Sequence, residues 1–194
     1  MVSSEFLQRK ANEFEPEEYK GISGSIFLSI GRLTEQKGFD MAIEAAKIMK
    51  NSNMRFQWFI IGDGELKEEL QARINTLQIG DRVHLIGERI NPYPYLAKAD
   101  VFVQPSRFEG KSVILSEAIA MKKIILATDY DTVFNQLEDH VTGIIVPQNA
   151  EAIAEGLIEL VTNETKCNWL RENLNRICNS EAKLQKEYLS FFNS

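Results

Sequence analysis

The sequence predicts an α/β protein built on a doubly wound, six-stranded parallel sheet of the Rossmann-like kind. Three observations lead to this prediction. Short apolar runs alternate with amphipathic helical segments along most of the chain. Each apolar run is nearly continuous, as expected for strands that are covered on both faces. A composition of 44% hydrophobic and 26% charged residues over 194 residues suits one globular domain with a substantial core.

The individual elements follow from the spacing of the apolar residues and from the turn residues that separate the runs. The run SIFLSI stops at Gly31, and RFQWFII leads into the turn GDG, so both are interpreted as buried strands. The expected strands are 25–30, 55–61, 82–87, 100–105, 123–128 and 143–147. The expected helices are 38–50, 65–77, 91–99, 112–122, 131–139, 149–162, 165–179 and 181–192. We expect residues 1–20 to form a helix and a charged linker, and residues 21–194 to form the sheet domain.

The net charge and the use of histidine and cysteine narrow the classes of function that the protein could have. A formal charge of −6, from 28 acidic and 22 basic residues, argues against a general nucleic-acid surface. Two histidines and two separated cysteines suggest no metal site. Cys167 and Cys178 would lie about 16 Å apart on a helix, which is too far for a disulfide and typical of reduced thiols. No run reaches the roughly 18 apolar residues of a membrane helix, so we expect a soluble, cytoplasmic protein.

Ligands of doubly wound sheets bind beyond the carboxyl ends of the strands, so the loops there are the candidate sites. The loop GRLTEQKG places Arg32 and Lys37 in one strand-to-helix turn that begins at Gly31. Two cations beside a helix N-terminus favour an anion, although a solvated loop is the alternative. The GDG turn lacks the third glycine of a dinucleotide fingerprint, and we interpret it as a tight turn capped by Asp63.

The segment EGKSVILSE places Glu109 before a predicted helix and Glu117 within it. Eight helical residues separate Cα atoms by about 12 Å, whereas a glycosidase pair needs carboxyl groups about 5–9.5 Å apart. Each carboxylate could instead accept hydrogen bonds from a vicinal diol. The amides between them would bind an anion at the helix N-terminus, and they belong to Gly110, Lys111, Ser112 and Val113. Diol, anion and diol describe a nucleotide sugar; the alternative is two solvated glutamates.

In this order on this fold, these motifs resemble the C-terminal, donor-binding domain of family 4 (group 1) retaining glycosyltransferases, one half of a GT-B architecture. The resemblance covers about residues 24–160. It rests on SIGRLTEQKG, FIIGDGELKEEL, VHLIG, ADVFVQPSRFEGKSVILSEAIA, ILATDYDTV and VTGIIVP. Where many members read Glu-Gly-Phe-Gly, this chain reads Glu-Gly-Lys-Ser. The segments EGKS and NPYPYLAKAD are similar to a branch that makes bacterial surface polysaccharides.

The resemblance implies a role for each matched residue. Arg32 and Lys37 would bind the donor diphosphate and stabilise negative charge on the leaving nucleotide. Glu109 would hold hydroxyls of the donor sugar, and Glu117 would hold the ribose hydroxyls. Backbone after the third strand would meet the base, at Arg89 and Ile90. Neither histidine of the chain matches a catalytic histidine of the family, and His84 is interpreted as structural.

The implied enzyme transfers a hexosyl group, with retention, from a UDP- or GDP-linked sugar to a glycan or lipid-linked acceptor, without a metal or other cofactor. In GT-B enzymes an N-terminal domain binds most of the acceptor. We therefore expect a donor-binding domain that is inactive alone and that contacts the inner membrane face only through the missing domain. Two alternatives are a non-catalytic nucleotide-sugar-binding module and a nucleotide-sugar epimerase of the same fold.

Overall fold

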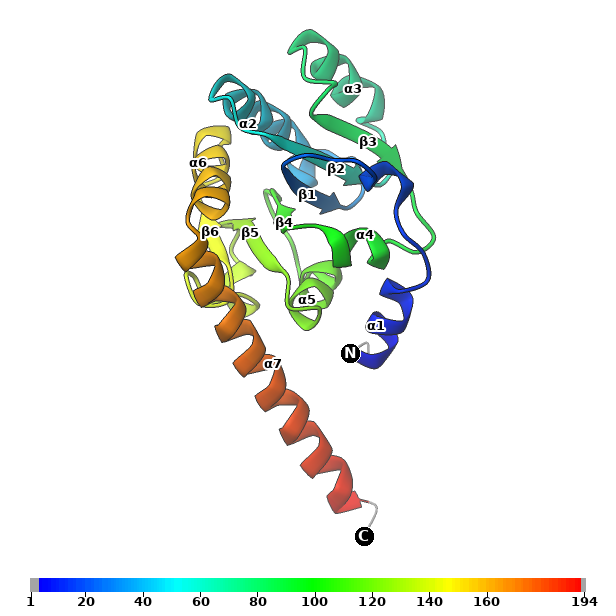
Figure 1. Cartoon of the computed structure of the whole chain (residues 1–194), viewed down its shortest axis with the longest axis vertical. Coiled ribbons are helices and arrows are strands. Elements are labelled where there is room, and N and C mark those ends of the chain that lie inside the picture. The colour runs from blue at the N-terminus through cyan, green and yellow to red at the C-terminus, as the bar shows by residue number, and fades with distance from the viewer. Residues whose placement is uncertain (1–3, 193–194) are drawn as a thin grey trace.

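The computed structural model describes residues 4–192, and from residue 181 onward only the helical backbone. Six parallel strands form one sheet in the order β3-β2-β1-β4-β5-β6, which confirms the predicted doubly wound, Rossmann-like fold (Figure 1). Every predicted strand agrees with the observed bounds to within one residue. The strands are β1 (Ser25–Ile30), β2 (Phe56–Ile61), β3 (Val83–Gly87), β4 (Val101–Gln104), β5 (Ile124–Thr128) and β6 (Ile144–Val146).

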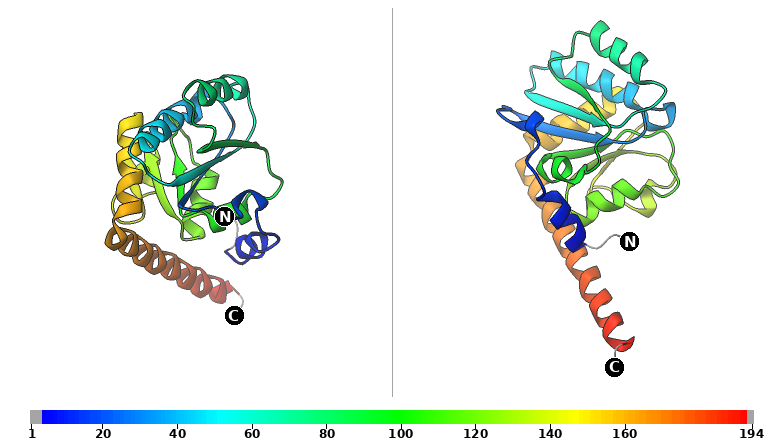
Figure 2. Two further views of the ribbon diagram at one scale, coloured as in Figure 1. Left: turned by 45° about the horizontal axis from the view of Figure 1, so that its top comes forward. Right: turned by 90° about the vertical axis from the view of Figure 1, so that its right-hand side faces the viewer.

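Helices cover both faces of the sheet, and each face has its own apolar core (Figures 1 and 2). Neighbouring residues of β2 enter opposite cores: Trp58 packs in one and Phe59 in the other. This explains why the strand is a nearly continuous apolar run in the sequence, interrupted only by Gln57. The first core is covered by α2 (Phe39–Asn51), α3 (Lys67–Thr76) and α6 (Ala150–Thr162). The second is covered by α4 (Tyr93–Lys98) and α5 (Val113–Ala120).

The N-terminal segment packs on the second core. It contains α1 (Ser4–Ala11) and the 3₁₀ turn η1 (Glu17–Tyr19). Leu7 and Ala11 are buried on α1, and the Tyr19 ring lies 4.7 Å from the Phe59 ring, measured between centroids. The expected helix is therefore present at the start of the chain, and the residues that follow it pack against the sheet domain.

Two helix predictions were wrong. Residues 131–139 form only the 3₁₀ turn η3 (Val133–Asn135), because polar side chains on either side of this turn bind the loop after β4 instead of facing solvent from a helix. Residues 165–179 and 181–192 are not two helices but one, α7 (Glu164–Phe192), since no glycine or proline interrupts the chain there. A second, short 3₁₀ turn, η2 (Glu35–Lys37), precedes α2.

The helix α7 extends away from the sheet at its C-terminal end (Figure 1). It carries Cys167 and Cys178, which are not joined in a disulfide, as their spacing predicted. The thiol of Cys167 donates to the Leu160 carbonyl at 2.8 Å. Within residues 4–192, no helix has the length and apolar composition needed to cross a membrane.

Glycines allow the loops at the carboxyl edge of the sheet to pack backbone against backbone. A Cβ on Gly38, whose φ is +64°, would lie 1.9 Å from the Pro105 carbonyl oxygen. A Cβ on Gly62 would also lie 1.9 Å from a carbonyl oxygen, that of Gly31, which follows β1. The carboxylate of Asp63 accepts the next backbone N–H at 2.7 Å, which confirms the structural interpretation of the GDG turn. The loops after β1, β2 and β4 therefore form one tightly packed platform.

Candidate functional site

The strand order reverses between β1 and β4, so the loops that follow these two strands meet at the carboxyl edge. Arg107 joins them. Its guanidinium donates to both carboxylate oxygens of Asp40, at 2.8 and 2.6 Å, and its backbone N–H donates to the Gln36 carbonyl at 2.8 Å. Burial is the largest influence on the pKa of Asp40 and raises it, but the hydrogen bonds and charge of Arg107, together with backbone hydrogen bonds, outweigh burial and hold that pKa below its ordinary value. The two loops thus have a fixed relative position.

Lys37 and Glu109 form an ion pair across this junction. The ammonium Nζ lies 2.5 Å from Glu109 Oε1, and the two side chains are 19% and 8% exposed. Gly31 leaves room for the lysine, because a Cβ at this position would lie 3.1 Å from Lys37 Cε. The sequence predicted these three residues at one site but not their direct contact. The pair places a cation and a carboxylate side by side where the strand order reverses.

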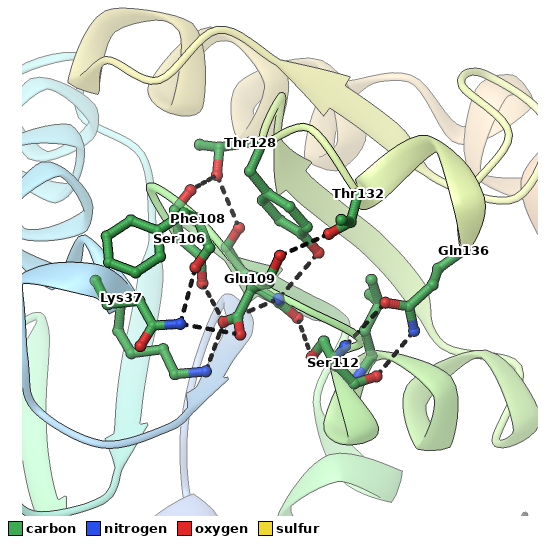
Figure 3. Close-up of polar contacts among 12 residues, drawn as sticks. Lys37, Ser106, Phe108, Glu109, Ser112, Thr128, Thr132 and Gln136 are labelled. Atoms are coloured by element: carbon green, nitrogen blue, oxygen red, sulfur yellow. Dashed lines mark hydrogen bonds and ion pairs between the residues drawn. The ribbon is translucent and has the colours of Figure 1, made fainter.

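Further donors hold the Glu109 carboxylate in one orientation (Figure 3). Its Oε1 also accepts from Ser106 Oγ at 2.8 Å and from Gln104 Nε2 at 3.4 Å. Among the side chains that the structure describes, Gln36 alone donates to Oε2, through a long 3.4 Å contact from its Nε2. One carboxylate oxygen is therefore occupied by the protein, and the other keeps hydrogen-bonding capacity for a ligand.

Gln104, at the end of β4, connects Glu109 to the start of α5. It is only 4% exposed. Its Nε2 also donates to the Tyr130 hydroxyl at 3.0 Å, and its Oε1 accepts from Ser112 Oγ at 3.1 Å. Burial, followed by the nearby charge of Glu109, raises the pKa of Tyr130, so its phenol stays neutral. The Glu109 carboxylate, the Tyr130 phenol and the Ser112 hydroxyl satisfy the buried amide of Gln104, which favours a single arrangement.

The N-terminus of α5 is capped by Ser112, whose Oγ accepts the Leu115 N–H at 3.3 Å. The N–H of Ser112 itself donates to Gln136 Oε1 at 2.9 Å, so this amide is already used within the protein. Within the part of the chain that the structure describes, no acceptor binds the amides of Gly110, Lys111 and Val113. Three of the four amides that the sequence singled out are therefore available to an anion.

Glu117 lies further along α5 and is half-buried. Its Oε1 accepts from the Tyr93 hydroxyl at 3.0 Å. Burial raises the pKa of Glu117, and the hydrogen bond from Tyr93 partly offsets this. Burial together with the bond to Glu117 raises the pKa of Tyr93 to about 12, so the phenol is a donor at neutral pH. As at Glu109, the protein holds one carboxylate oxygen and leaves the other open.

The remaining candidates lie around this edge but do not contact the ion pair. Arg89 turns toward the N-terminal segment, where its guanidinium binds Glu18 Oε1 at 2.7 Å and the Tyr95 hydroxyl at 3.1 Å. Ile90 is fully exposed. Arg32 is exposed, and within the described side chains no hydrogen bond or ion pair holds it. Both of the latter side chains are thus presented to solvent at the site.

His84 has no place in the site. It lies in β3, where its Nε2 is 2.5 Å from Gln57 Oε1 and its ring stacks on Phe59 at 4.9 Å between centroids. Burial lowers its pKa, so the ring is neutral at pH 7. Its role as a packed strand residue agrees with the structural interpretation.

Sequence reasoning missed the residues that position the site. A glutamine at the end of an otherwise apolar strand was the one signal for Gln104. The others lie in segments whose side-chain partners depend on the three-dimensional fold. They are Gln36, Tyr93, Ser106, Thr132 and Gln136.

The comparisons with known proteins identify the class. Residues 11–176 match the model of the family described as glycosyl transferases group 1, and the chain belongs to this family. It is 35% identical over 148 residues to the amylovoran biosynthesis glycosyltransferase AmsK of Erwinia amylovora, covering 71% of this chain and 36% of that protein. It is 36% identical over 128 residues to an uncharacterised glycosyltransferase of Methanocaldococcus jannaschii, covering 65% and 32%. The chain thus spans about a third of the length of these relatives.

Solved structures share the fold, and the neighbours are glycosyltransferases of the GT-B architecture. A variant of S. aureus TarM, in complex with Fondaparinux, alpha-GlcNAc-glycerol and UDP, superposes with a TM-score of 0.71 at 26% identity, covering 94% of this chain and 38% of that one. The C-terminal domain of a group 1 glycosyl transferase, LpcC of Francisella tularensis, gives a TM-score of 0.75 at 20% identity, covering 94% and 98%. The sheet described above therefore corresponds in extent to that C-terminal domain.

Proposed function

We propose that this chain binds a nucleotide diphosphate sugar at the carboxyl edge of the sheet and forms the donor half of a hexosyltransferase. The observation that carries the proposal is the Lys37–Glu109 ion pair, set across the point where the strand order reverses and beside three available amides of α5. Family membership makes a glycosyl donor the expected ligand. The UDP in the TarM variant supports a nucleotide diphosphate as its leaving group.

In the proposed complex, the diphosphate lies over the N-terminus of α5. The free amides and the helix dipole attract its charge, and Lys37 and the exposed Arg32 supply cations that stabilise the leaving group. The open Oε2 of Glu109 accepts a hydroxyl of the donor sugar, next to the lysine that binds the phosphate. At the other end, the open oxygen of Glu117 accepts a ribose hydroxyl. The base lies along the backbone at Arg89 and Ile90.

We further propose transfer with retention to a glycan or lipid-linked acceptor in bacterial surface polysaccharide synthesis, on the cytoplasmic side of the membrane. The names of several relatives support a role in polysaccharide synthesis, among them AmsK and a putative colanic acid biosynthesis glycosyltransferase, WcaL, of Escherichia coli. The acceptor would bind mainly to a second domain of the GT-B architecture. A nucleotide-sugar-binding module without catalysis is the second candidate, because every contact named above serves binding of the donor.

A thermal-shift panel tests donor binding. We expect UDP- or GDP-linked hexoses to raise the melting temperature in the presence of EDTA, because Arg32 and Lys37 replace a divalent cation as the diphosphate counter-charge. Among the described residues, no three His, Cys, Asp or Glu side chains gather as a metal site. ADP-linked sugars and free hexoses complete the panel. Strict dependence on magnesium, or no shift with any nucleotide sugar, would contradict the proposal.

A further inference from the structure

Gln136 makes a reciprocal pair of hydrogen bonds with the backbone of Ser112. Its Oε1 accepts the Ser112 N–H at 2.9 Å, and its Nε2 donates to the Ser112 carbonyl at 2.8 Å. The same Nε2 lies 2.8 Å from Ser116 Oγ, one turn further along α5. The side chain therefore holds the first turn of α5 from outside, as Figure 3 shows.

Thr132, at the other end of the turn η3, holds the opposite end of the loop. Its Oγ1 donates to the Glu109 carbonyl at 2.9 Å. The segment from Glu109 to Ser112 is thus attached at both ends to one short stretch of the β5–β6 connection. Between the two attachments, Gly110 has nothing within 4 Å of a Cβ position, so the middle of the loop faces open space.

We infer that Gln136 is a positioning residue for the anion site, and that Ser112 serves as a structural anchor and does not contact the ligand through its amide. This inference rests on the proposed function. Because Gln136 uses the Ser112 N–H, a diphosphate meets the neighbouring amides of Gly110, Lys111 and Val113. Because Gln136 also binds the Ser112 carbonyl, those amides are oriented before the ligand arrives. Gln136, in the β5–β6 connection, then holds the loop Glu-Gly-Lys-Ser at 109–112 in the conformation that binds the anion.

Two substitutions separate the acceptor from the donor of this side chain. Gln136→Met keeps the length and removes both hydrogen bonds to Ser112. Gln136→Glu keeps an acceptor for the Ser112 N–H, removes the donor to its carbonyl, and adds negative charge beside the anion site. Gln71→Met is the matched control, because Gln71 is exposed on α3 and, among the described side chains, its amide donates only to Asn75 Oδ1, at 3.2 Å.

The experiment combines amide hydrogen exchange with calorimetry of UDP and GDP binding. In Gln136→Met, we expect faster exchange at Ser112 and an affinity for the nucleotide diphosphate that is about fivefold to tenfold weaker. In Gln136→Glu, we expect exchange at Ser112 to stay slow. The affinity for the nucleotide diphosphate, measured relative to the wild type at the same salt concentration, should fall at low salt and recover in part at high salt, because salt screens the added repulsion. Gln71→Met should match the wild type in both measurements.

The experiment distinguishes failure of the assignment of Gln136 from failure of the proposed function. If the wild type binds neither UDP nor GDP, the proposed function and this assignment both fail. If the wild type binds and both Gln136 variants bind equally well, the assignment alone is overturned. A lower melting temperature with unchanged affinity and no salt effect would show that Gln136 only stabilises the fold.

Discussion

In both Glu109 and Glu117, the protein holds one of the two carboxylate oxygens. Lys37 and Ser106 hold Oε1 of Glu109, and Tyr93 holds Oε1 of Glu117. A carboxylate that is fixed in this way loses little rotamer freedom when a ligand arrives, so more of its hydrogen-bond energy contributes to affinity. Each glutamate therefore binds a ligand hydroxyl mainly through its second carboxylate oxygen, and not through both oxygens of a free carboxylate.

The Tyr93 hydroxyl should set the ionisation of Glu117. Because its hydrogen bond stabilises the carboxylate, Tyr93→Phe is expected to raise the pKa of Glu117 beyond the increase that burial already causes. A carbon-13 NMR titration of the Glu117 carboxyl group measures this directly. Tyr95→Phe is the matched control, since that phenol binds Glu18 and Arg89 instead. An unchanged or lower pKa in Tyr93→Phe would contradict the assigned contact.

At the scale of residues, the sequence indicated which side chains lie at the carboxyl edge but not which side chains contact one another. The cation Lys37 and the carboxylate Glu109 were both predicted at the carboxyl edge. Their mutual contact depends on β1 lying beside β4, and strand order is not encoded in hydrophobic period. Gln136 was hidden for a similar reason, because its segment has the pattern of a helix while its side chain serves a distant loop.

At the scale of elements, the packed loops depend on glycine. Gly38→Ala should destabilise the protein through two effects. A left-handed conformation costs a non-glycine residue about 1–2 kcal/mol, and the overlap with the Pro105 carbonyl adds roughly another 1–3 kcal/mol. Gly21→Ala isolates the first effect, because its φ is +71° and nothing lies within 4 Å of a Cβ there.

Differential scanning calorimetry compares the two variants. With about 2–4 °C lost per kcal/mol in a domain of this size, Gly38→Ala should melt well below Gly21→Ala. Equal melting temperatures would show that the loops after β1 and β4 do not pack as described.

The strands themselves were predictable because parallel strands buried on both faces give nearly continuous apolar runs, as in β2 and β5. The two errors share a cause. Periodicity cannot distinguish a short helix from a 3₁₀ turn whose polar side chains point to another loop, as around η3. Nor does it place a boundary inside a polar stretch such as residues 179–181, where α7 continues.

For the whole molecule, the proposed function gives the ligand one orientation along the carboxyl edge of the sheet. In the proposed complex, the sugar end lies at Glu109, the phosphates over α5 and the ribose end at Glu117. The match to the family model establishes family membership, whereas the orientation of the ligand is proposed. This orientation predicts different losses of affinity for the two glutamates, so one substitution at each is enough to test it.

Calorimetry of Glu109→Gln and Glu117→Gln, each with UDP and with a UDP-linked hexose that shifts the wild type, is the most direct test; GDP ligands replace these if the panel selects them. Loss of a hydrogen bond to a charged group costs about 1.5–3 kcal/mol, or about tenfold or more in affinity. Glu117→Gln should weaken both ligands, since both carry ribose. Glu109→Gln should weaken only the nucleotide sugar and leave UDP binding no weaker, because Lys37 loses its internal partner. With wild-type melting temperatures as the control, equal losses for both ligands in both variants, or no loss in either, would contradict the two-ended site.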